Sequence, residues 1–396
     1  MIEIPRPQFD FTRPRLKIFG LGGAGCNAVD RIVLDGPSEA DVIAINTDIQ
    51  ALTGSIARAK VQIGQTVTRG LGAGGDPEVG RMAAEEGVGE ILGALTDATI
   101  VFLVVGLGGG TGSGAAPAIA ELAREHHAMV VVFATLPFQF EGRRRTGQAM
   151  EALEALQPFA DILICFENDK MSDLVSPKAS IQEAFSVADA TIGQSIRALA
   201  AMTLRRGPMH MGFDEVASVV RGENVRSLFG YGESSGDNRA HEALEAALGC
   251  PFLDRGRRLR ETEKILVQIA GGPDLTLNEV QILMEEVQRY VPQEAQLFFG
   301  SAVDPALTGR LAVNILTSVP AELPAEAAAP APANRKIRPA TPPPAPVRVS
   351  VPVAQPAEPA AAEEELELDL GVAESTEEFE AEGETDYAPV DLEAEA

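Results

Sequence analysis

Two glycine-rich loops contain the residues of this sequence whose spacing is best suited to chemistry. The first reads GLGGAG over Gly20–Gly25 and the second reads GLGGGTGSG over Gly106–Gly114. Each loop follows a short apolar run and precedes a segment with helical spacing, so its backbone N–H groups can approach an anion at a helix N-terminus. So many glycines cost conformational entropy that an ordinary turn does not require, and the Thr and Ser hydroxyls add further donors. Both loops therefore predict phosphate binding.

A third loop, GLGAGGDP over Gly70–Pro77, also precedes a helix. The sequence holds no G-x-x-x-x-G-K-[ST], which excludes a P-loop enzyme. Several phosphate-facing loops at one sheet edge favour a triphosphate over a dinucleotide. Gly20–Gly25 taken alone also fits a dinucleotide fingerprint with Asp48 as the ribose acid. The alternative of an NAD(P)-dependent oxidoreductase therefore stays open, although the second half of the chain offers no convincing catalytic residue for it.

The elements that must position these loops alternate along the first half of the chain. Short runs rich in Val, Ile and Phe predict buried strands, and helical segments begin near Gly25, Pro77, Gly114, Gly142 and Ser180. Such alternation predicts an α/β fold with a doubly wound parallel sheet and ligands at the carboxyl ends of its strands. The predicted strands are Leu16–Phe19, Val42–Ile45, Thr99–Val105, Met129–Thr135 and Ile162–Phe166.

A long helical segment, Ile181–Leu204, is predicted to form a spine between two domains. After Gly207 the rhythm changes and predicts a smaller α/β domain with a mixed sheet. The predicted elements are helices Phe213–Val220, Asn238–Leu248 and Leu277–Val291, and strands Val225–Tyr231, Lys264–Ala270, Gln296–Ala302 and Arg310–Ser318. The expected organisation is a flexible arm (1–14), a nucleotide-binding domain (15–180), a central helix (181–205), a C-terminal domain (206–319), a Pro/Ala-rich linker (320–360) and an acidic disordered tail (361–396).

Charge is distributed unevenly over the 396 residues. The chain has 58 Asp/Glu against 32 Lys/Arg, a formal charge of −26, which opposes binding to nucleic acid or to anionic lipid. Fifteen of the acids and no base lie in 361–396, and twelve prolines lie in 320–360, so both segments are expected to be disordered. No secretory signal is visible, the apolar runs are too short to span a membrane, and the three cysteines are far apart. These features predict a soluble, cytoplasmic protein.

The sequence resembles the tubulin/FtsZ family of GTPases, and within it the bacterial cell-division branch. The resemblance extends from Lys17 to about Val319, and its glycine signature is GGGTGSG. Five further motifs occur in the order typical of the family: GLGGAGCNAV (Gly20–Val29), INTD (Ile45–Asp48), GLGAGGDPEVGR (Gly70–Arg81), PFQFEGRRR (Pro137–Arg145) and NDK (Asn168–Lys170).

The resemblance implies a guanine-nucleotide site and names its residues. Glu141 and Arg145 match an acid and a base near the ribose and phosphates, and Phe185 and Asp189 match positions that contact guanine. An Asp carboxylate can accept hydrogen bonds from guanine N1–H and N2–H₂, which adenine does not offer. Taken singly, each of these side chains could equally be an ordinary core or surface residue that contacts no ligand. The implied phosphate-binding residues are Gly23, Ala24, Gly25, Cys26, Asn27, Gly110, Thr111 and Gly112.

The resemblance also implies GTP hydrolysis in head-to-tail filaments of the division ring at mid-cell, with Mg²⁺ on the phosphates. In such filaments a loop of the next subunit brings acids to the nucleotide, in a pattern close to N-x-D-x-x-D. Here the loop reads HMGFDE from His210, with Gly212 in place of the first acid and Glu215 in place of the second. Glu215 is thus the candidate catalytic residue. The altered loop also supports an alternative, a structural paralogue that binds GTP with weak or no hydrolysis.

The expected partners are other copies of the chain, together with tethering or regulatory proteins that bind the C-terminal tail. Many relatives end in a short peptide that contains a basic residue, but the last ten residues here, YAPVDLEAEA, contain none. The segment LELDL (Leu366–Leu370) is an alternative recognition element. No nucleic-acid partner and no direct membrane insertion are expected, because the tail carries only negative charge.

Overall fold

The computed structural model describes residues 14–36, 40–171, 175–176, 178–204, 216, 218–219 and 225–320. Glu215, the rest of its loop, residues 1–13 of the predicted arm, the predicted linker from 321 on and the acidic tail lie outside the described residues. The structural statements below concern the described ranges only.

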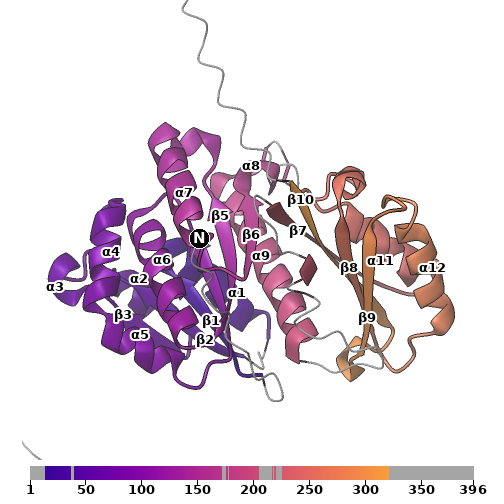
Figure 1. The fold of residues 1–396 in the computed structure, drawn as a ribbon, viewed down its shortest axis with the longest axis horizontal. Coiled ribbons are helices and arrows are strands. Elements are labelled where there is room, and N and C mark those ends of the chain that lie inside the picture. Colours follow the sequence, from indigo (N-terminus) through magenta and orange to yellow (C-terminus); the bar gives the residue numbers. More distant parts are fainter. Residues whose placement is uncertain are drawn as a thin grey trace, which may run out of the picture. The chain divides into compact units, whose positions relative to one another are not determined.

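The strands of these ranges form one ten-stranded sheet in the order β3-β2-β1-β4-β5-β6-β7-β10-β8-β9 (Figure 1). All pairings from β3 to β6 are parallel, β10 is antiparallel to both of its neighbours, and β8 and β9 are parallel. The two halves of the sheet meet at a narrow seam, because β6 and β7 pair only through Ile164 and Ser227. The strands are β1 (Leu16–Leu21), β2 (Asp41–Asn46), β3 (Ala59–Gln62), β4 (Ile100–Gly106), β5 (Met129–Leu136), β6 (Ile162–Glu167), β7 (Val225–Ser235), β8 (Lys264–Gly271), β9 (Gln296–Val303) and β10 (Arg310–Pro320).

Helices cover both faces of the parallel half, which explains why its strands read as unbroken apolar runs. In β4, Phe102 and Val104 face a core shared with α1 and α9, whereas Leu103 and Val105 face a core shared with α4 to α7. The helices of this half are α1 (Gly22–Leu34), α2 (Ile49–Gly54), α3 (Gln65–Thr68), α4 (Pro77–Glu86), α5 (Val88–Leu95), α6 (Gly110–Glu125), α7 (Arg143–Leu156), α8 (Asn168–Met171) and α9 (Ile181–Leu204), with the 3₁₀ turn η1 (Gln139–Glu141) between β5 and α7.

The C-terminal half packs α11 (Arg239–Leu248) and α12 (Leu277–Val287) against one face of its mixed sheet. Phe229, Leu266 and Leu316 belong instead to the core that surrounds α9, so this helix contributes to both halves. The structure confirms the predicted fold class: a doubly wound parallel sheet, a long central helix and a smaller α/β domain.

A buried arginine joins the elements of the C-terminal half. Arg239, at the start of α11, bonds through Nε to Glu279 Oε1 at 2.6 Å and through Nη1 to Asp274 Oδ2 at 2.5 Å. The hydrogen bond from Arg239 lowers the pKa of Glu279 to about 2. Glu279 also forms the capping box of α12 with Thr276. One cation thereby fixes both the start of α11 and the start of α12.

Two predicted helix starts were wrong in a way that matters for the site. Helices expected to begin near Gly25 and Gly114 begin at Gly22 and Gly110. Residue patterns place a helix start at the first periodic apolar residue, whereas here the glycine loops themselves form the first helical turns. The glycine amides are therefore the N–H groups that a helix leaves unpaired at its start.

Candidate functional site

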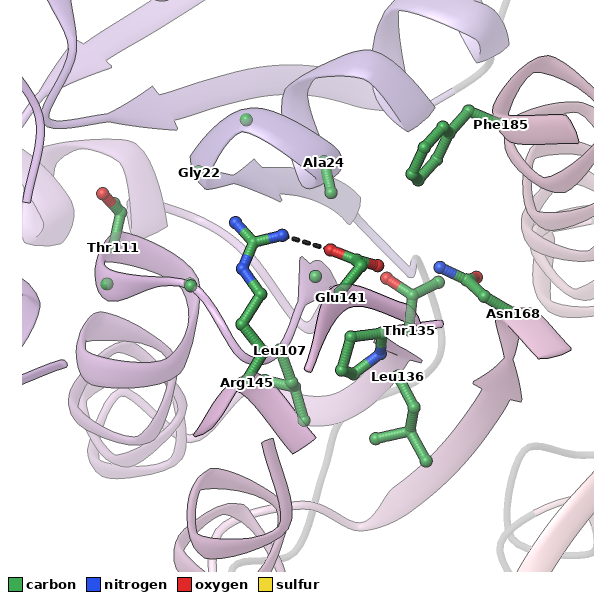
Figure 2. A pocket seen from close by; sticks show the side chains of 16 residues that line it. Gly22, Ala24, Leu107, Thr111, Thr135, Leu136, Glu141, Arg145, Asn168 and Phe185 are labelled. Atoms are coloured by element: carbon green, nitrogen blue, oxygen red, sulfur yellow. Dashed lines mark hydrogen bonds and ion pairs between the residues drawn. The ribbon is translucent and has the colours of Figure 1, made fainter. Parts of the chain in front are cut away.

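A pocket of about 280 Å³ opens at the carboxyl ends of the parallel strands (Figure 2). Its walls come from the starts of α1 and α6, the ends of β4 and β5, the turn η1, and single residues of α7, α8 and α9. The residues that line it are Gly22, Gly23, Ala24, Gly106, Leu107, Gly109, Gly110, Thr111, Gly112, Thr135, Leu136, Pro137, Glu141, Arg145, Asn168 and Phe185.

Two helices present uncapped N-termini to this pocket. Neither α1, preceded by Leu21, nor α6, preceded by Gly109, has a side-chain hydrogen bond to its first amides. Side chains cap α2, α4 and α12, namely those of Asp48, Asp76 and Thr276. Because α3, α5, α7 and α11 also lack a side-chain cap, it is their position at the pocket that distinguishes α1 and α6. The first N–H groups of a helix lack partners within it and carry a partial positive charge. The pocket thus concentrates backbone donors and a positive potential that suit an anion.

Close packing explains some of the glycines in these loops. A Cβ at Gly25 would lie 2.3 Å from the carbonyl oxygen of Val104, and one at Gly114 would lie 1.8 Å from that of Pro77. These glycines let α1 approach β4 and let α6 approach α4. The density of glycine is therefore not, as the sequence suggested, a consequence of anion binding alone.

Gly23 and Gly109 differ, because a Cβ at either position would meet no protein atom within 4 Å. Both residues line the pocket. Packing within the chain therefore does not require glycine at these two positions. A ligand close to the main chain would require it.

Arg145 and Glu141 form an ion pair beside the pocket, one turn apart, as Figure 2 shows. Glu141 is held in place because its Oε1 also accepts a hydrogen bond from the Phe138 amide at 2.9 Å. The side chain of Glu141 is 13% exposed and that of Arg145 is 52% exposed. The arginine is therefore positioned by the acid while its guanidinium stays accessible to a ligand.

Aromatic rings border the opposite part of the pocket. Phe185 of α9, which is 38% exposed, meets Phe138 edge to face at 5.2 Å between ring centroids. Phe138 in turn stacks on Phe140 at 4.9 Å. An exposed ring held in place by its neighbours provides a flat apolar surface of the kind that planar bases contact.

Asn168 is the most informative polar residue of the pocket. It is only 8% exposed, and its Oδ1 has no hydrogen-bond partner within the described ranges. Buried side-chain acceptors without partners are uncommon in folded proteins and call for an explanation. Figure 2 shows the amide nitrogen of Asn168 turned towards the pocket, so a ligand donor would meet the oxygen only after the amide turned by 180°.

Asp189 lies one helical turn after Phe185 on α9, but the pocket does not extend to it. Burial raises the pKa of Asp189 to about 6, and the nearby charge of Arg31 opposes that shift. A carboxylate in this position bears a desolvation cost at neutral pH. This cost falls if a bound group donates hydrogen bonds to it.

Eight of the twelve residues predicted to bind nucleotide line the pocket together: Gly23, Ala24, Gly110, Thr111, Gly112, Glu141, Arg145 and Phe185. Gly25, Cys26, Asn27 and Asp189 do not line it. The thiol of Cys26 points into the protein, with Sγ 3.5 Å from the carbonyl oxygen of Gly20, and burial raises its pKa to about 12. Asn27 is exposed on α1.

Of the other eight lining residues, Gly22, Gly106, Leu107 and Gly109 lie in the glycine loops predicted to bind phosphate, whereas Thr135, Leu136, Pro137 and Asn168 were not predicted. Asn168 and Pro137 lie within the NDK and PFQFEGRRR motifs, which identify them as candidates, and Thr135 ends a predicted strand. Thr111 also has a partner that no motif indicated, because its hydroxyl lies 2.7 Å from that of Thr47. This hydrogen bond joins the second glycine loop to the end of β2.

The described ranges contain neither a helix long and apolar enough to cross a membrane nor a group of three or more His, Cys, Asp or Glu side chains arranged to hold a metal ion.

Comparisons with known proteins identify the family of this chain. Residues 15–176 match the model of the tubulin/FtsZ family GTPase domain, and residues 226–319 match that of the FtsZ family C-terminal domain. The chain is 38% identical over 317 residues to the cell division protein FtsZ of Rhizobium radiobacter, a match that covers 80% of this chain and 54% of that protein.

Solved structures give the same result. The chain is similar to an empty FtsZ dimer from M. jannaschii, with a TM-score of 0.69 and 36% identity over 78% of this chain and 88% of the other. It is also similar to CetZ2 from Haloferax volcanii, in a protofilament with GTPγS, with a TM-score of 0.62 and 26% identity over 76% and 92%. The chain belongs to the tubulin/FtsZ family of GTPases.

Proposed function

We propose that this chain binds GTP and GDP in the pocket at the carboxyl ends of β1, β4 and β5. The observation that carries the proposal is the convergence of two uncapped helix N-termini on a pocket that is also lined by the half-exposed guanidinium of Arg145. One end of the pocket suits phosphates and the other suits a base. Membership of the family favours a guanine nucleotide over a dinucleotide.

The phosphates would lie against the first turns of α1 and α6, where Gly23 and Gly109 leave room for close approach. Arg145 would add a full positive charge at this end. Mg²⁺ would accompany the triphosphate, because phosphate oxygens are the hard ligands that this ion prefers. When bound, the ion neutralises phosphate charge. The residues of the pocket bind and orient the nucleotide.

Guanine would be selected over adenine by acceptors near Phe185. Asn168 Oδ1 and the carboxylate of Asp189 accept hydrogen bonds and cannot pair with each other. Guanine N1–H and N2–H₂ supply donors, whereas adenine presents an acceptor at N1. We propose that contact with guanine offsets the desolvation cost of Asp189.

We propose that the nucleotide pocket is covered by a second copy of the chain in a head-to-tail filament. Leu71 is 82% exposed on the third glycine loop, and Phe140 is 68% exposed on η1. Both segments border the pocket: Ala73 of the loop lies against Gly110, and Phe140 stacks on Phe138. Exposed apolar side chains around a pocket favour burial in an interface. CetZ2, a structural relative, forms a protofilament with GTPγS bound, which supports assembly of copies into a filament.

Hydrolysis would then depend on the loop of the neighbouring copy. With Gly212 replacing one expected acid, Glu215 would orient or deprotonate the attacking water alone. General-base assistance is worth roughly 10²–10⁴ in rate, so we propose slow hydrolysis with nearly normal nucleotide binding. In a cell the filament would act in the cytoplasm, at the mid-cell division ring, and proteins that bind the tail would tether or regulate it.

One set of measurements tests these proposals. Nucleotide extracted from purified protein should be GDP or GTP, and GTP with Mg²⁺ should make the protein pellet while phosphate is released. Gly212→Asp should raise phosphate release, with Gly89→Asp as the matched control at an exposed glycine of α5. Recovery of NAD(P), or no affinity for guanine nucleotides, would refute the proposed function. Pelleting without phosphate release above background would favour a structural polymer that does not hydrolyse GTP.

A further inference from the structure

We propose that Asp35 keeps the guanidinium of Arg31 away from Asp189 and thereby leaves the Asp189 carboxylate free for a guanine base. Asp35 is a positioning residue, because it does not line the pocket and acts through another side chain. The inference rests on the proposed contact between Asp189 and guanine, and it adds the cation that competes for the same carboxylate. The observation that carries it is an arginine that lies between two acids where α1 packs on α9.

Charged residues of α1 and α9 face each other with matching spacing. Asp189, Gly193 and Arg197 follow one another at intervals of four residues, so they lie on one face of α9. Arg31 and Asp35 show the same interval on α1. A Cβ at Gly193 would lie 3.6 Å from Cγ of Arg31, so the stem of the arginine runs across α9 between its two charged residues. The contact between the helices therefore brings two acids and two arginines together.

The ion pair between Arg31 and Asp35 is close but not locked. Nε of Arg31 lies 3.0 Å from Asp35 Oδ1, yet this buried nitrogen makes no hydrogen bond within the described ranges. The other oxygen of Asp35, Oδ2, lies 2.5 Å from Nη2 of Arg197, so α9 holds the acid in place. A pair without a directed hydrogen bond is weaker than one that has it, so Arg31 can exchange Asp35 for another carboxylate.

Helix stability does not explain why an acid occupies position 35. Asp35 is the C-cap of α1, where the partial negative charge of the helix end disfavours a carboxylate. Arg31, in the last turn of the same helix, suits that end by itself. The charge of Asp35 is instead accounted for by the two arginines that it contacts.

Asp189 lies within reach of Arg31 but is not paired with it. The arginine charge acts on Asp189, because it lowers the pKa that burial raises. No ion pair joins Asp189 to another described residue. One turn of a helix, about 5.4 Å, separates Asp189 from Gly193, a distance that an arginine stem at Gly193 covers by rotation about its own bonds. Arg31 can therefore pair with either acid, and in this structure it pairs with Asp35.

No other cation competes for Asp189 among the described side chains of the elements packed on α9. Those elements are α1, α8 and β7. Their other charged side chains are engaged with different residues: Asp30 with Ser55, Asp169 with Gln139, Lys170 with Glu167, and Glu233 with Arg310. The position of Arg31 therefore sets the charge that Asp189 experiences.

Pairing with Arg31 would obstruct the recognition of guanine. Guanine N1–H and N2–H₂ donate side by side, so they require both oxygens of one carboxylate. A guanidinium often binds a carboxylate through the same two oxygens. Removal of the Asp35 charge leaves Asp189 as the acid nearest to Arg31, and the base must then displace an arginine.

Melting of the nucleotide-free protein at pH 7 tests the competition by itself. In the parent chain, Asp189→Asn removes an unpaired, partly buried charge and should raise the melting temperature. In the Asp35→Asn background Arg31 pairs with Asp189, so the same substitution should lower the melting temperature. Glu85→Gln removes an acid from another i,i+4 pair and is the matched background, in which the sign should stay as in the parent. The same sign in the Asp35→Asn background would overturn the proposal.

GTP titration at pH 7 and pH 5 tests the consequence for binding. Asp35→Asn should weaken GTP binding about tenfold at pH 7, and the affinity should change little at pH 5, because a paired Asp189 stays ionised. Adding Arg31→Met to Asp35→Asn should restore the affinity at pH 7, since the competing cation is gone. A double variant that binds no better than Asp35→Asn would show a merely structural role and overturn the proposal.

The two readouts separate this inference from the proposed function. If Asp189→Asn alone leaves GTP affinity unchanged, the guanine contact fails, and with it the benefit of Asp35 to the base. If Asp189→Asn weakens GTP binding but its effect on melting does not change sign, only the role of Asp35 fails. Should Asp35→Asn not fold, Arg31→Met in the parent chain gives the test. Its GTP affinity should begin to fall at a higher pH than in the parent, and an unchanged or lower midpoint would overturn the proposal.

Discussion

Replacing Asp189 by Asn should stabilise the nucleotide-free protein and at the same time weaken its affinity for GTP. The carboxyl is partly buried on α9, and burial raises its pKa from 3.8 to about 6. The folded state therefore holds a proton more tightly than the unfolded state does. Stability from this group is complete below pH 3.8 and is lost as the pH rises through 6. At pH 7 the ionised side chain is a net cost to the fold.

The size of the expected change in the free energy of unfolding follows from the shift of the Asp189 pKa. About two pKa units correspond to at most about 3 kcal/mol, because each unit is worth about 1.4 kcal/mol. Asn has the same shape without the charge, so Asp189→Asn should raise the free energy of unfolding by roughly 1–3 kcal/mol at pH 7. The gain should vanish near pH 4. In binding, loss of a charged acceptor for guanine should cost roughly 1.5–3 kcal/mol, or about 10–150-fold in Kd.

Two measurements check this prediction. Thermal unfolding of nucleotide-free protein at pH 4 and pH 7 gives the stability difference, since bound nucleotide would mask it. Titration with GTP at pH 7 and at pH 5 gives the affinity for the nucleotide. For the wild type this affinity should fall about tenfold from pH 7 to pH 5, because Asp189 (pKa about 6) becomes protonated. For the variant it should fall less. Inosine triphosphate, which lacks the 2-amino group, should lose less affinity than GTP on substitution. Glu183→Gln, at an exposed acid of the same helix, is the control.

The reasoning would be refuted by either of two results. If Asp189→Asn destabilises the nucleotide-free protein at pH 7, the carboxylate is not held at a cost. If GTP affinity and its pH profile are unchanged in the variant, Asp189 makes no contact with guanine.

Three further predictions concern other parts of the chain. Gly109→Ala should leave the melting temperature nearly unchanged, because the new methyl group meets no protein atom. The same methyl group adjoins the proposed phosphate position, so GTP binding should weaken at least tenfold. Gly89→Ala, at an exposed glycine outside the pocket, is the control and should change neither quantity. Arg239→Ala should lower stability by about 2–4 kcal/mol at pH 7 in denaturant unfolding, since it removes the cation that joins two acids. Because Glu279 has a depressed pKa of about 2, its contribution to the free energy of unfolding is lost as the pH falls from 4.5 towards 2. In Arg239→Ala the free energy of unfolding should not show this fall. Gly212→Asp should raise phosphate release during assembly by tenfold or more without changing GTP affinity, and an unchanged rate would contradict the role assigned to that loop position.

The fold could be predicted from the sequence because its parallel strands are buried on both faces. A run such as Thr99–Val105 has only one stable environment, and the observed β4 differs from it by one residue at each end. Helix Ile181–Leu204 was predicted with the same limits as α9, because its apolar residues serve two cores. Element ends that depend on local hydrogen bonds were harder to place. The helix predicted to end at Val291 ends at Val287.

The site was predicted in part for a similar reason. Motifs identify residues that bind through main-chain atoms at a helix start, such as Gly23 and Gly110, because their spacing is fixed by the turn. They do not indicate which glycine serves packing, as Gly114 does, since that depends on how close a second helix lies. They also gave no role to Asn168, whose unpartnered oxygen becomes evident only once its burial is known.

The narrow seam between β6 and β7 determines how the two halves of the molecule are held together. A single residue pair, Ile164 and Ser227, supplies little main-chain resistance to bending there. Cohesion therefore comes mainly from side chains, in the core where Phe229, Leu266 and Leu316 surround α9. Because the main-chain link is a single residue pair, packing on α9 is what joins the two halves, and Phe185 near the first turn places the same helix in the wall of the pocket.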